Sequence, residues 1–151
     1  MKGKRWVDIK SYMDRVEEVL GEGTLGRRDN ITAYFTERMN HSFGICRTTF
    51  VRSRPTTSVI SLSLPWLRAI KGLAGPEVAK AELEQTIYHE LCHVYEQHQG
   101  STNHSAHWRY AMRRLGLPAD ILHFATGDTC VPGTKVTWRQ VWAQKESASK
   151  G

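Results

Sequence analysis

Two histidines four residues apart, His89 and His93, lie inside a long segment with the signals of one helix. Pro76 suits the first turn of a helix and Gly100 marks a stop, so the sequence predicts a helix from 76 to about 99. Side chains four residues apart project from nearly the same side of a helix. Two imidazoles in that arrangement can hold one zinc ion with little rearrangement. The chain must therefore fold so that one face of this helix stays open to a ligand.

The opposite side of the same helix is apolar. Leu83, Ile87, Leu91 and Val94 form a stripe at helical spacing. We expect this stripe to pack on the core while the histidine face lines a cleft. A His-Glu-x-x-His match by itself arises often by chance, and an amphipathic helix is the context that it requires.

Glu90 follows the first histidine and is the candidate catalytic base. It lies roughly 80° around the helix from the midpoint of the two histidines, at about 100° per residue. That is too far round for it to share their role easily, but it flanks a metal held between them. From there a carboxylate can accept a proton from water, which is the general-base role in zinc peptidases.

A catalytic zinc ion needs a third protein ligand if its fourth position is to hold water. Metzincins have glycine and histidine three and six residues after the motif, where this chain has Glu96 and Gln99, so that family is excluded. Thermolysin-like enzymes take a glutamate from a later helix, but no glutamate occurs between Glu96 and Glu146. The remaining candidates are His98, His104 and His107.

His104 leads among these three candidates. His98 lies five residues after His93, which turns it away from the first two ligands if the helix continues. His104 follows the short polar loop 100–103, which lets the chain double back, and His107 is the reserve. The alternative to a metal site is an ordinary solvated helix face, which the third histidine and the apolar stripe disfavour.

The order of motifs resembles that of a known family. After the helix and a loop come His104-Ser-Ala-His-Trp108, then Met112 and Leu115-Gly-Leu-Pro118. This resembles the SprT/Spartan metallopeptidases, in which a His-Glu-x-x-His helix and a loop lead to His-Gly-x-x-Phe/Trp. Upstream, 60–67 and 82–86 are similar to the family's last strand and to its approach to the active-site helix. The resemblance covers about residues 30 to 125.

The resemblance implies a zincin-like α+β fold, with a small antiparallel sheet packed against the active-site helix. It also implies zinc-dependent proteolysis, and better-known members are implicated in the repair of DNA–protein crosslinks. The chain departs from the family at Ser105, where glycine is usual, and in the short loop before it. The lone Cys130 cannot build the carboxy-terminal zinc ribbon that many members carry.

The length of 151 residues suits a single domain over 1–151. The amino-terminal segment 1–21 contains a helical pattern from Trp6 to Leu20, and 143–151 looks like a frayed tail. Three short strands, expected to be antiparallel, precede the active-site helix, and a further helix and one further strand follow it. Their expected bounds are 31–36, 44–52 and 59–64 for the strands, 104–115 for the helix and 134–142 for the last strand.

Several polar residues are weaker candidates for the site. Glu96 shares the histidine face and could support a metal ligand, although such a residue is more often solvated. His107 and Tyr110 could stabilise an oxyanion, and solvent-facing positions are slightly favoured for them. Ser61 and Ser63 would line the strand nearest the site, and an edge strand there could bind substrate backbone by β-addition.

The chain carries 21 Lys and Arg against 15 Asp and Glu, a net charge of +6 that favours polyanionic partners such as DNA. Any one group of basic residues is, however, more often simply a solvated surface. The second hypothesis is therefore a basic DNA-binding module with a structural or residual zinc site, and a third is a zinc hydrolase of smaller amides. The candidate nucleic-acid contacts are Arg47, Arg52, Arg54, Arg109, Arg113 and Arg114.

Three cysteines with no close pairing argue against a disulfide scaffold and fit a reducing compartment. The basic amino terminus has no apolar run behind it, so we expect no signal peptide. The longest apolar stretches, such as 59–67, are too short to span a membrane. The expected location is the cytoplasm, with association to the nucleoid as one option. Substrate identity and oligomeric state stay open.

Overall fold

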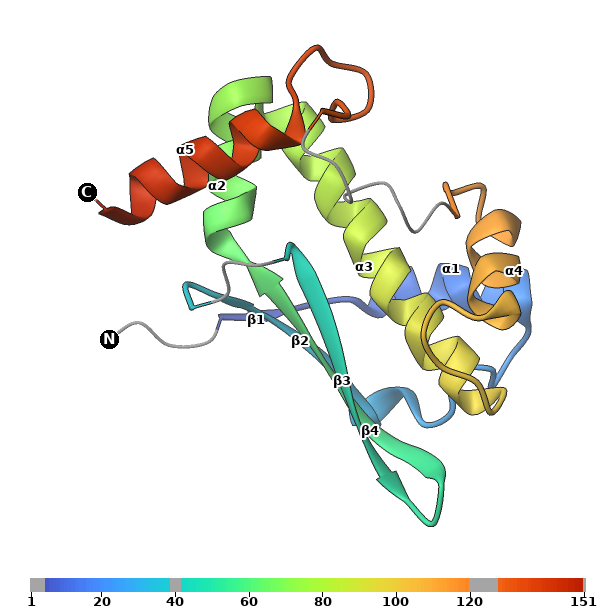
Figure 1. The fold of residues 1–151 in the computed structure, drawn as a ribbon. Coiled ribbons are helices and arrows are strands. Elements are labelled where there is room, and N and C mark those ends of the chain that lie inside the picture. Colours follow the sequence, from blue (N-terminus) through green and yellow to red (C-terminus); the bar gives the residue numbers. More distant parts are fainter. Residues whose placement is uncertain (1–4, 39–41, 120–127, 151) are drawn as a thin grey trace.

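The computed structural model of the chain describes residues 5–38, 42–119 and 128–150. It has the predicted α+β fold, in which helices α1, α3 and α4 lie on one side of a small sheet (Figure 1). The strands are β1 (Arg5–Val7), β2 (Ile31–Thr36), β3 (Gly44–Val51) and β4 (Arg54–Ser63). The helices are α1 (Lys10–Leu20), the short 3-10 helix η1 (Arg28–Asn30), α2 (Leu64–Ala74), α3 (Pro76–His98), α4 (Ala106–Arg114) and α5 (Trp138–Lys150).

The sheet is mixed, with the strand order β1-β2-β4-β3. The pair β3–β4 is antiparallel, as predicted, and the unpredicted strand β1 also pairs antiparallel with β2. However, β2 and β4 run parallel, so the expectation of a wholly antiparallel sheet is wrong there. Burial explains the order. Ile60 and Leu62 of β4 are fully buried, whereas no residue of β3 is buried. The more apolar strand takes the central place beside β2, and β3 forms the edge.

Local signals place α2 and α3 directly after the sheet. Ser63 ends β4, and its side-chain oxygen accepts a hydrogen bond from the backbone N–H of Trp66 at 3.2 Å, which caps α2. Gly75, with φ of +95°, lets the chain turn between the two helices. Helix α3 then begins at Pro76 and ends at His98, close to the predicted bounds. Within the described ranges, no helix is both long and apolar enough to cross a membrane.

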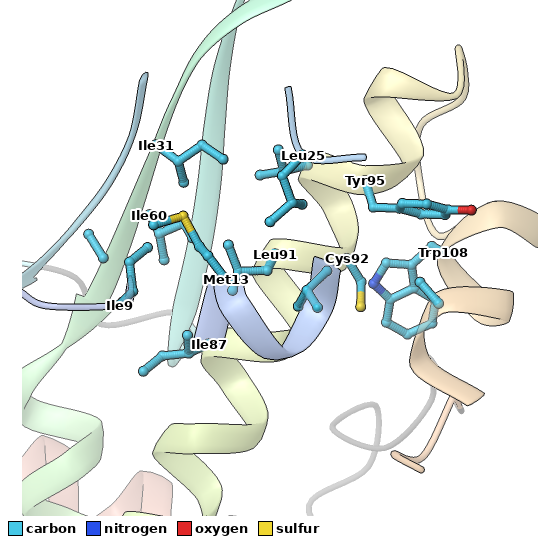
Figure 2. Packing of buried hydrophobic residues seen from close by; sticks show 14 of the residues in the cluster. Ile9, Met13, Leu25, Ile31, Ile60, Ile87, Leu91, Cys92, Tyr95 and Trp108 are labelled. Atoms are coloured by element: carbon cyan, nitrogen blue, oxygen red, sulfur yellow. The ribbon is translucent and has the colours of Figure 1, made fainter. Parts of the chain in front are cut away.

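The main core lies between the sheet and helices α1, α3 and α4, and Figure 2 shows its packing. Ile87 and Leu91 of the predicted apolar stripe point from α3 towards Ile9 and Met13. A second cluster joins α2, α5 and the first turns of α3 around Trp138. Helix α3 therefore contributes to both cores, which fixes the face that it turns away from them.

Two expectations for the ends of the chain are corrected by the structure. The helix expected from Trp6 starts only at Lys10, because 5–7 pair with β2 as strand β1. The strand expected at 134–142 is largely the start of α5. Thr137 and Gln140 form a reciprocal cap there, in which each side chain accepts a hydrogen bond from the other's backbone N–H.

Helix α5 continues through Lys150, across most of the segment for which we expected a frayed tail. Residue 151 of that segment lies outside the described residues, as do 1–4 of the expected amino-terminal helical region.

Candidate metal centre

Helix α3 and the loop after it bring three histidines together. His89 and His93 project from one face of α3, and the chain returns through 99–105 to place His104 against them. One nitrogen from each ring lies within 4.8 Å of the other two, and the Nε2 atoms of His89 and His104 are 3.2 Å apart. Two nitrogens bound to one tetrahedral zinc ion at its usual bond lengths lie about 3.3 Å apart. The spacing therefore fits zinc.

The loop reaches this position through left-handed backbone. Asn103 and His104 have φ of +62° and +56°, a conformation that asparagine tolerates better than most residues. Ser105 follows as the cap of α4, and its hydroxyl accepts from the backbone N–H of Trp108 at 3.5 Å. A capping serine stands where the SprT/Spartan pattern has glycine, and it starts the helix that closes the site.

Trp108 packs against all three imidazole rings. Its side chain is fully buried, with ring centroids 4.8 Å from His89, 5.8 Å from His93 and 4.6 Å from His104. Its indole N–H donates to the backbone carbonyl of His89 at 3.2 Å. Figure 2 shows the indole against α3 from the core side. The tryptophan thus has a packing role, because it fixes the spacing between α3 and α4.

Glu96 ties two parts of the site to one carboxylate. It is completely buried. Its Oε2 accepts from Nδ1 of His93 at 2.5 Å, and its Oε1 accepts from the backbone N–H of Ser105 at 3.0 Å. Burial alone would raise the pKa of Glu96, but the hydrogen bonds from Ser105 and His93 hold it below its ordinary value. The more common reading of Glu96 as a solvated residue is therefore wrong.

All three histidines have lowered pKa values. Burial is the main cause for His89, whose pKa falls to about 3, and the nearby His93 and His104 lower it further. Burial also lowers the pKa of His93, against the opposing effect of Glu96, and that of His104. The rings are therefore neutral at pH 7, which is the form that binds a metal ion.

Glu90 is buried beside the histidines, with Oε2 3.9 Å from Nε2 of His89. Burial raises its pKa to about 8, although a hydrogen bond from the backbone of Cys46 acts in the opposite direction. The carboxyl group is thus placed next to the nitrogens that would hold a cation, and a cation there would favour its ionised form.

An open cleft of about 540 Å³ gives access to these groups. Edge strand β3 forms one wall and helix α3 the other. Gly44 allows the close approach, because a Cβ at that position would lie 2.6 Å from Cγ2 of Thr86 and 3.3 Å from Oε2 of Glu90. The residues that line this cleft, called the histidine cleft below, are Gly44, Ile45, Cys46, His89, Glu90, His93, Gln97, Thr102, Asn103 and His104.

Other histidine and tyrosine candidates lie outside the histidine cleft. His107 is exposed and its Nδ1 pairs with the hydroxyl of Ser101 at 2.6 Å. Tyr110 is 51% exposed, and neither residue lines the cleft. His98 is turned away from the other histidines, as expected, and its ring lies against Gly26.

The strand nearest the site is not the expected one. Ser61 and Ser63 are buried in β4, which lies between β2 and β3 inside the sheet. The edge strand beside the cleft is β3, so the expectation that the serines line a substrate-binding edge is wrong. Residues 60–63 of β4 are all buried, so side chains on both faces of this part of the strand are shielded from solvent.

The candidate arginines fall into two separate groups, all of them exposed. Three lie on the β3–β4 hairpin, which extends past the end of the helices, and three lie on α4 (Figure 1). The hairpin group is Arg47, Arg52 and Arg54, and the helix group is Arg109, Arg113 and Arg114.

Gly44, Gln97 and Asn103 are among the cleft residues that sequence reasoning did not assign to the site. The available signals were weak. A glycine at the start of a strand can mark a close approach of backbone, and an asparagine in a short loop can mark left-handed backbone. For Gln97 the signal was its position four residues after His93 on the same face of the helix, although its place in the cleft also depends on how β3 packs against α3.

Comparison with known proteins agrees with the geometry. The family model for the SprT-like family matches residues 9–126, which is most of the chain. No curated protein and no solved structure matches it. The matched region contains the three histidines, Glu90 and both helices that carry the site. On this match, the chain belongs to the SprT-like family.

Proposed function

We propose that the protein is a zinc-dependent endopeptidase, with His89, His93 and His104 as metal ligands and Glu90 as the catalytic base. The observation that carries the proposal is the convergence of three neutral imidazole nitrogens within 4.8 Å, next to a buried carboxyl group. These groups face an open cleft rather than the core. A purely structural zinc site has no need of a carboxyl group there, and membership of the SprT-like family supports a metallopeptidase.

In this mechanism a zinc ion on the three histidines supplies a Lewis acid that polarises the scissile carbonyl and makes water more acidic. Glu90 takes the proton from the attacking water and passes it to the leaving amine. Glu96 keeps Nδ1 of His93 engaged, so that the lone pair of Nε2 points to the ion. Trp108 holds the rings at their spacing from below.

The substrate is proposed to be an extended polypeptide. Strand β3 pairs on one side with β4 only, and its first three residues line the histidine cleft on the other. An extended peptide can add to such an edge through backbone hydrogen bonds. That placement would bring a peptide bond past the histidines without any need for a deep pocket.

The test is cleavage of an unfolded protein by the purified chain, with zinc and with a chelator. Glu90→Gln should still bind zinc but lose at least 10³-fold in rate, because no group is left to move the proton. Glu77→Gln, which changes an exposed carboxylate on the first turn of α3, is the matched control and should keep the wild-type rate. A Glu90→Gln variant that still cleaves would remove Glu90 from the role of base.

A second part of the proposal is that the substrates are proteins on DNA. The β3–β4 hairpin has three exposed arginines and no acidic residue. None of these arginines has an ion pair within the described ranges. Phe50, beside them, is 46% exposed and could stack on a base. Exposed cations without partners suit a polyanion, and the net charge of +6 favours the same kind of partner.

Binding to single-stranded DNA at several salt concentrations tests this part. The triple variant Arg47→Ala, Arg52→Ala and Arg54→Ala should weaken binding and reduce its salt dependence by about three phosphate contacts. A matched variant, with Arg109, Arg113 and Arg114 changed to alanine, shows whether α4 also contributes to DNA binding. DNA binding without proteolysis under any condition would favour the alternative, a DNA-binding module with a structural zinc site.

The cytoplasm is the proposed location. Cys46, Cys92 and Cys130 are all free in the structure, and free thiols suit a reducing compartment. Fractionation of cells that make the tagged protein would test this, and recovery from an oxidising compartment would contradict it.

A further inference from the structure

The histidine cleft extends beyond the histidines to a polar end. Gln97, Thr102 and Asn103 line this end, and the mechanism above uses none of them. Small-molecule and peptide pockets are usually lined by apolar side chains with only a few polar groups. Three polar side chains at one end therefore indicate that this end recognises something polar.

Gln97 is held in place from the sheet. The hydroxyl of Thr48 on β3 donates to Oε1 of Gln97 at 2.5 Å, and the same hydroxyl lies 2.9 Å from that of Ser58 on β4. This hydrogen bond uses only the oxygen of the Gln97 amide. In the part of the chain that the structure describes, Nε2 of Gln97 makes no hydrogen bond, nor do the side chains of Thr102 and Asn103. The amide is thus fixed in position with its donor group unused.

The position of Gln97 on α3 indicates how far it lies from the scissile bond of a bound substrate. It lies four residues after His93, one turn further along the same face of α3, which is a rise of about 6 Å. An extended peptide advances about 3.3 Å per residue. A substrate that runs along β3 with its scissile carbonyl at the histidines therefore brings a residue one or two positions away beside Gln97.

We propose that Gln97 determines substrate specificity by selecting an asparagine or glutamine side chain one or two residues from the scissile bond. This inference rests on the proposed function. A primary amide in the substrate accepts a hydrogen bond from Nε2 of Gln97 and donates to the oxygens of Thr102 or Asn103. Among the described residues that line the cleft, a carboxylate would find no lysine or arginine. An aliphatic side chain would displace water from the polar groups without replacing its hydrogen bonds.

The test uses Gln97→Met, which keeps the length and helix propensity of the side chain and removes its hydrogen-bonding groups. Gln99→Met, at an exposed position two residues on, is the matched control. Peptides that differ only in Gln, Asn, Glu or Leu at each position around one bond are compared in two assays. One is kcat/KM for cleavage by the zinc-loaded enzyme, and the other is binding to the zinc-loaded Glu90→Gln protein by fluorescence anisotropy.

The expected result is about a tenfold preference for Gln and Asn over Leu at one position, as one net hydrogen bond provides. Gln97→Met should lose this preference in both assays, whereas Gln99→Met should keep it. An unchanged preference in Gln97→Met, or no preference in the wild type, would overturn the inference. If binding shows the preference but no peptide is cleaved, the inference stands and the proposed function fails.

Discussion

Helix α3 buries three carboxyl groups, and the two that lie furthest apart along it, Glu82 and Glu96, have opposite electrostatics. Glu82 is 4% exposed, and its carboxyl group has no hydrogen bond or ion pair within the described ranges. Burial raises its pKa to about 7. Glu96, in the second half, is fully buried, yet its pKa lies below the ordinary value because it accepts hydrogen bonds from Ser105 and His93. Two similar burials therefore leave Glu82 about half protonated near neutral pH and Glu96 charged.

The difference shows that the hydrogen-bond partners of a buried carboxyl group, rather than its burial, distinguish the half of α3 that carries the histidines. A charge without partners is costly inside a protein, so Glu82 reduces stability where the pH would ionise it. The charge on Glu96 instead joins α3 to the loop that carries His104. Glu90 has one backbone partner, but burial still raises its pKa to about 8, and a nearby cation would complete its environment.

The largest effect in this comparison is expected at Glu96. His93 and Ser105 each donate to a different oxygen of Glu96, so Glu96→Gln places an NH2 group, which cannot accept, opposite one of these donors. Zinc affinity should fall by up to about 100-fold, as when other groups that orient metal ligands are removed. Competition with a chromophoric chelator measures this. Glu82→Gln is the control, and the comparison breaks if both variants lose the same affinity.

A smaller effect, in stability, is expected at Glu82. The folded protein keeps a proton that the unfolded chain releases above about pH 4.5, so stability falls as the pH rises from there to about 7. Glu82→Gln removes this loss and should stabilise the fold at pH 8 by about 1–2 kcal/mol, with little change at pH 4. Urea unfolding at both pH values measures it, and a destabilised variant at pH 8 would show that the carboxyl group has a partner after all.

The smallest expected effect is the release of a single proton when zinc binds. With a pKa of about 8, Glu90 carries a proton at pH 7 in the metal-free protein, whereas His89 is already neutral. Binding of zinc should therefore release about one proton from Glu90, and the apparent affinity should rise as the pH increases from 6 to 8. Calorimetry in buffers of different ionisation enthalpy counts the protons. Equal release from the wild type and Glu90→Gln would assign the proton to another group.

Much of the architecture was predictable because it follows from local patterns. The bounds of α3 follow from Pro76 and Gly100, and its buried side follows from the stripe that includes Ile87 and Leu91. The parallel pairing of β2 with β4 was not predictable in this way. It depends on which strand of a hairpin packs against the helices, and that choice is made by burial across the whole sheet.

The residues of the site likewise divide into those that local patterns predict and those that depend on contacts between distant segments. The spacing of His89 and His93 is a property of one helix, so the sequence predicts that their side chains meet. The contact from Glu96 to Ser105 joins residues nine apart across a loop with left-handed backbone, and no periodicity encodes it. The place of Gln97 in the cleft likewise requires the contact with Thr48 from the sheet.

The central claim is that three imidazoles hold one zinc ion and leave a position for water. X-ray absorption at the zinc edge of the loaded protein tests it most directly. The account predicts one zinc per chain with three imidazole nitrogens and one further oxygen at about 2.0–2.1 Å. A shell that contains sulfur, or only two imidazoles, would contradict the assignment of His89, His93 and His104.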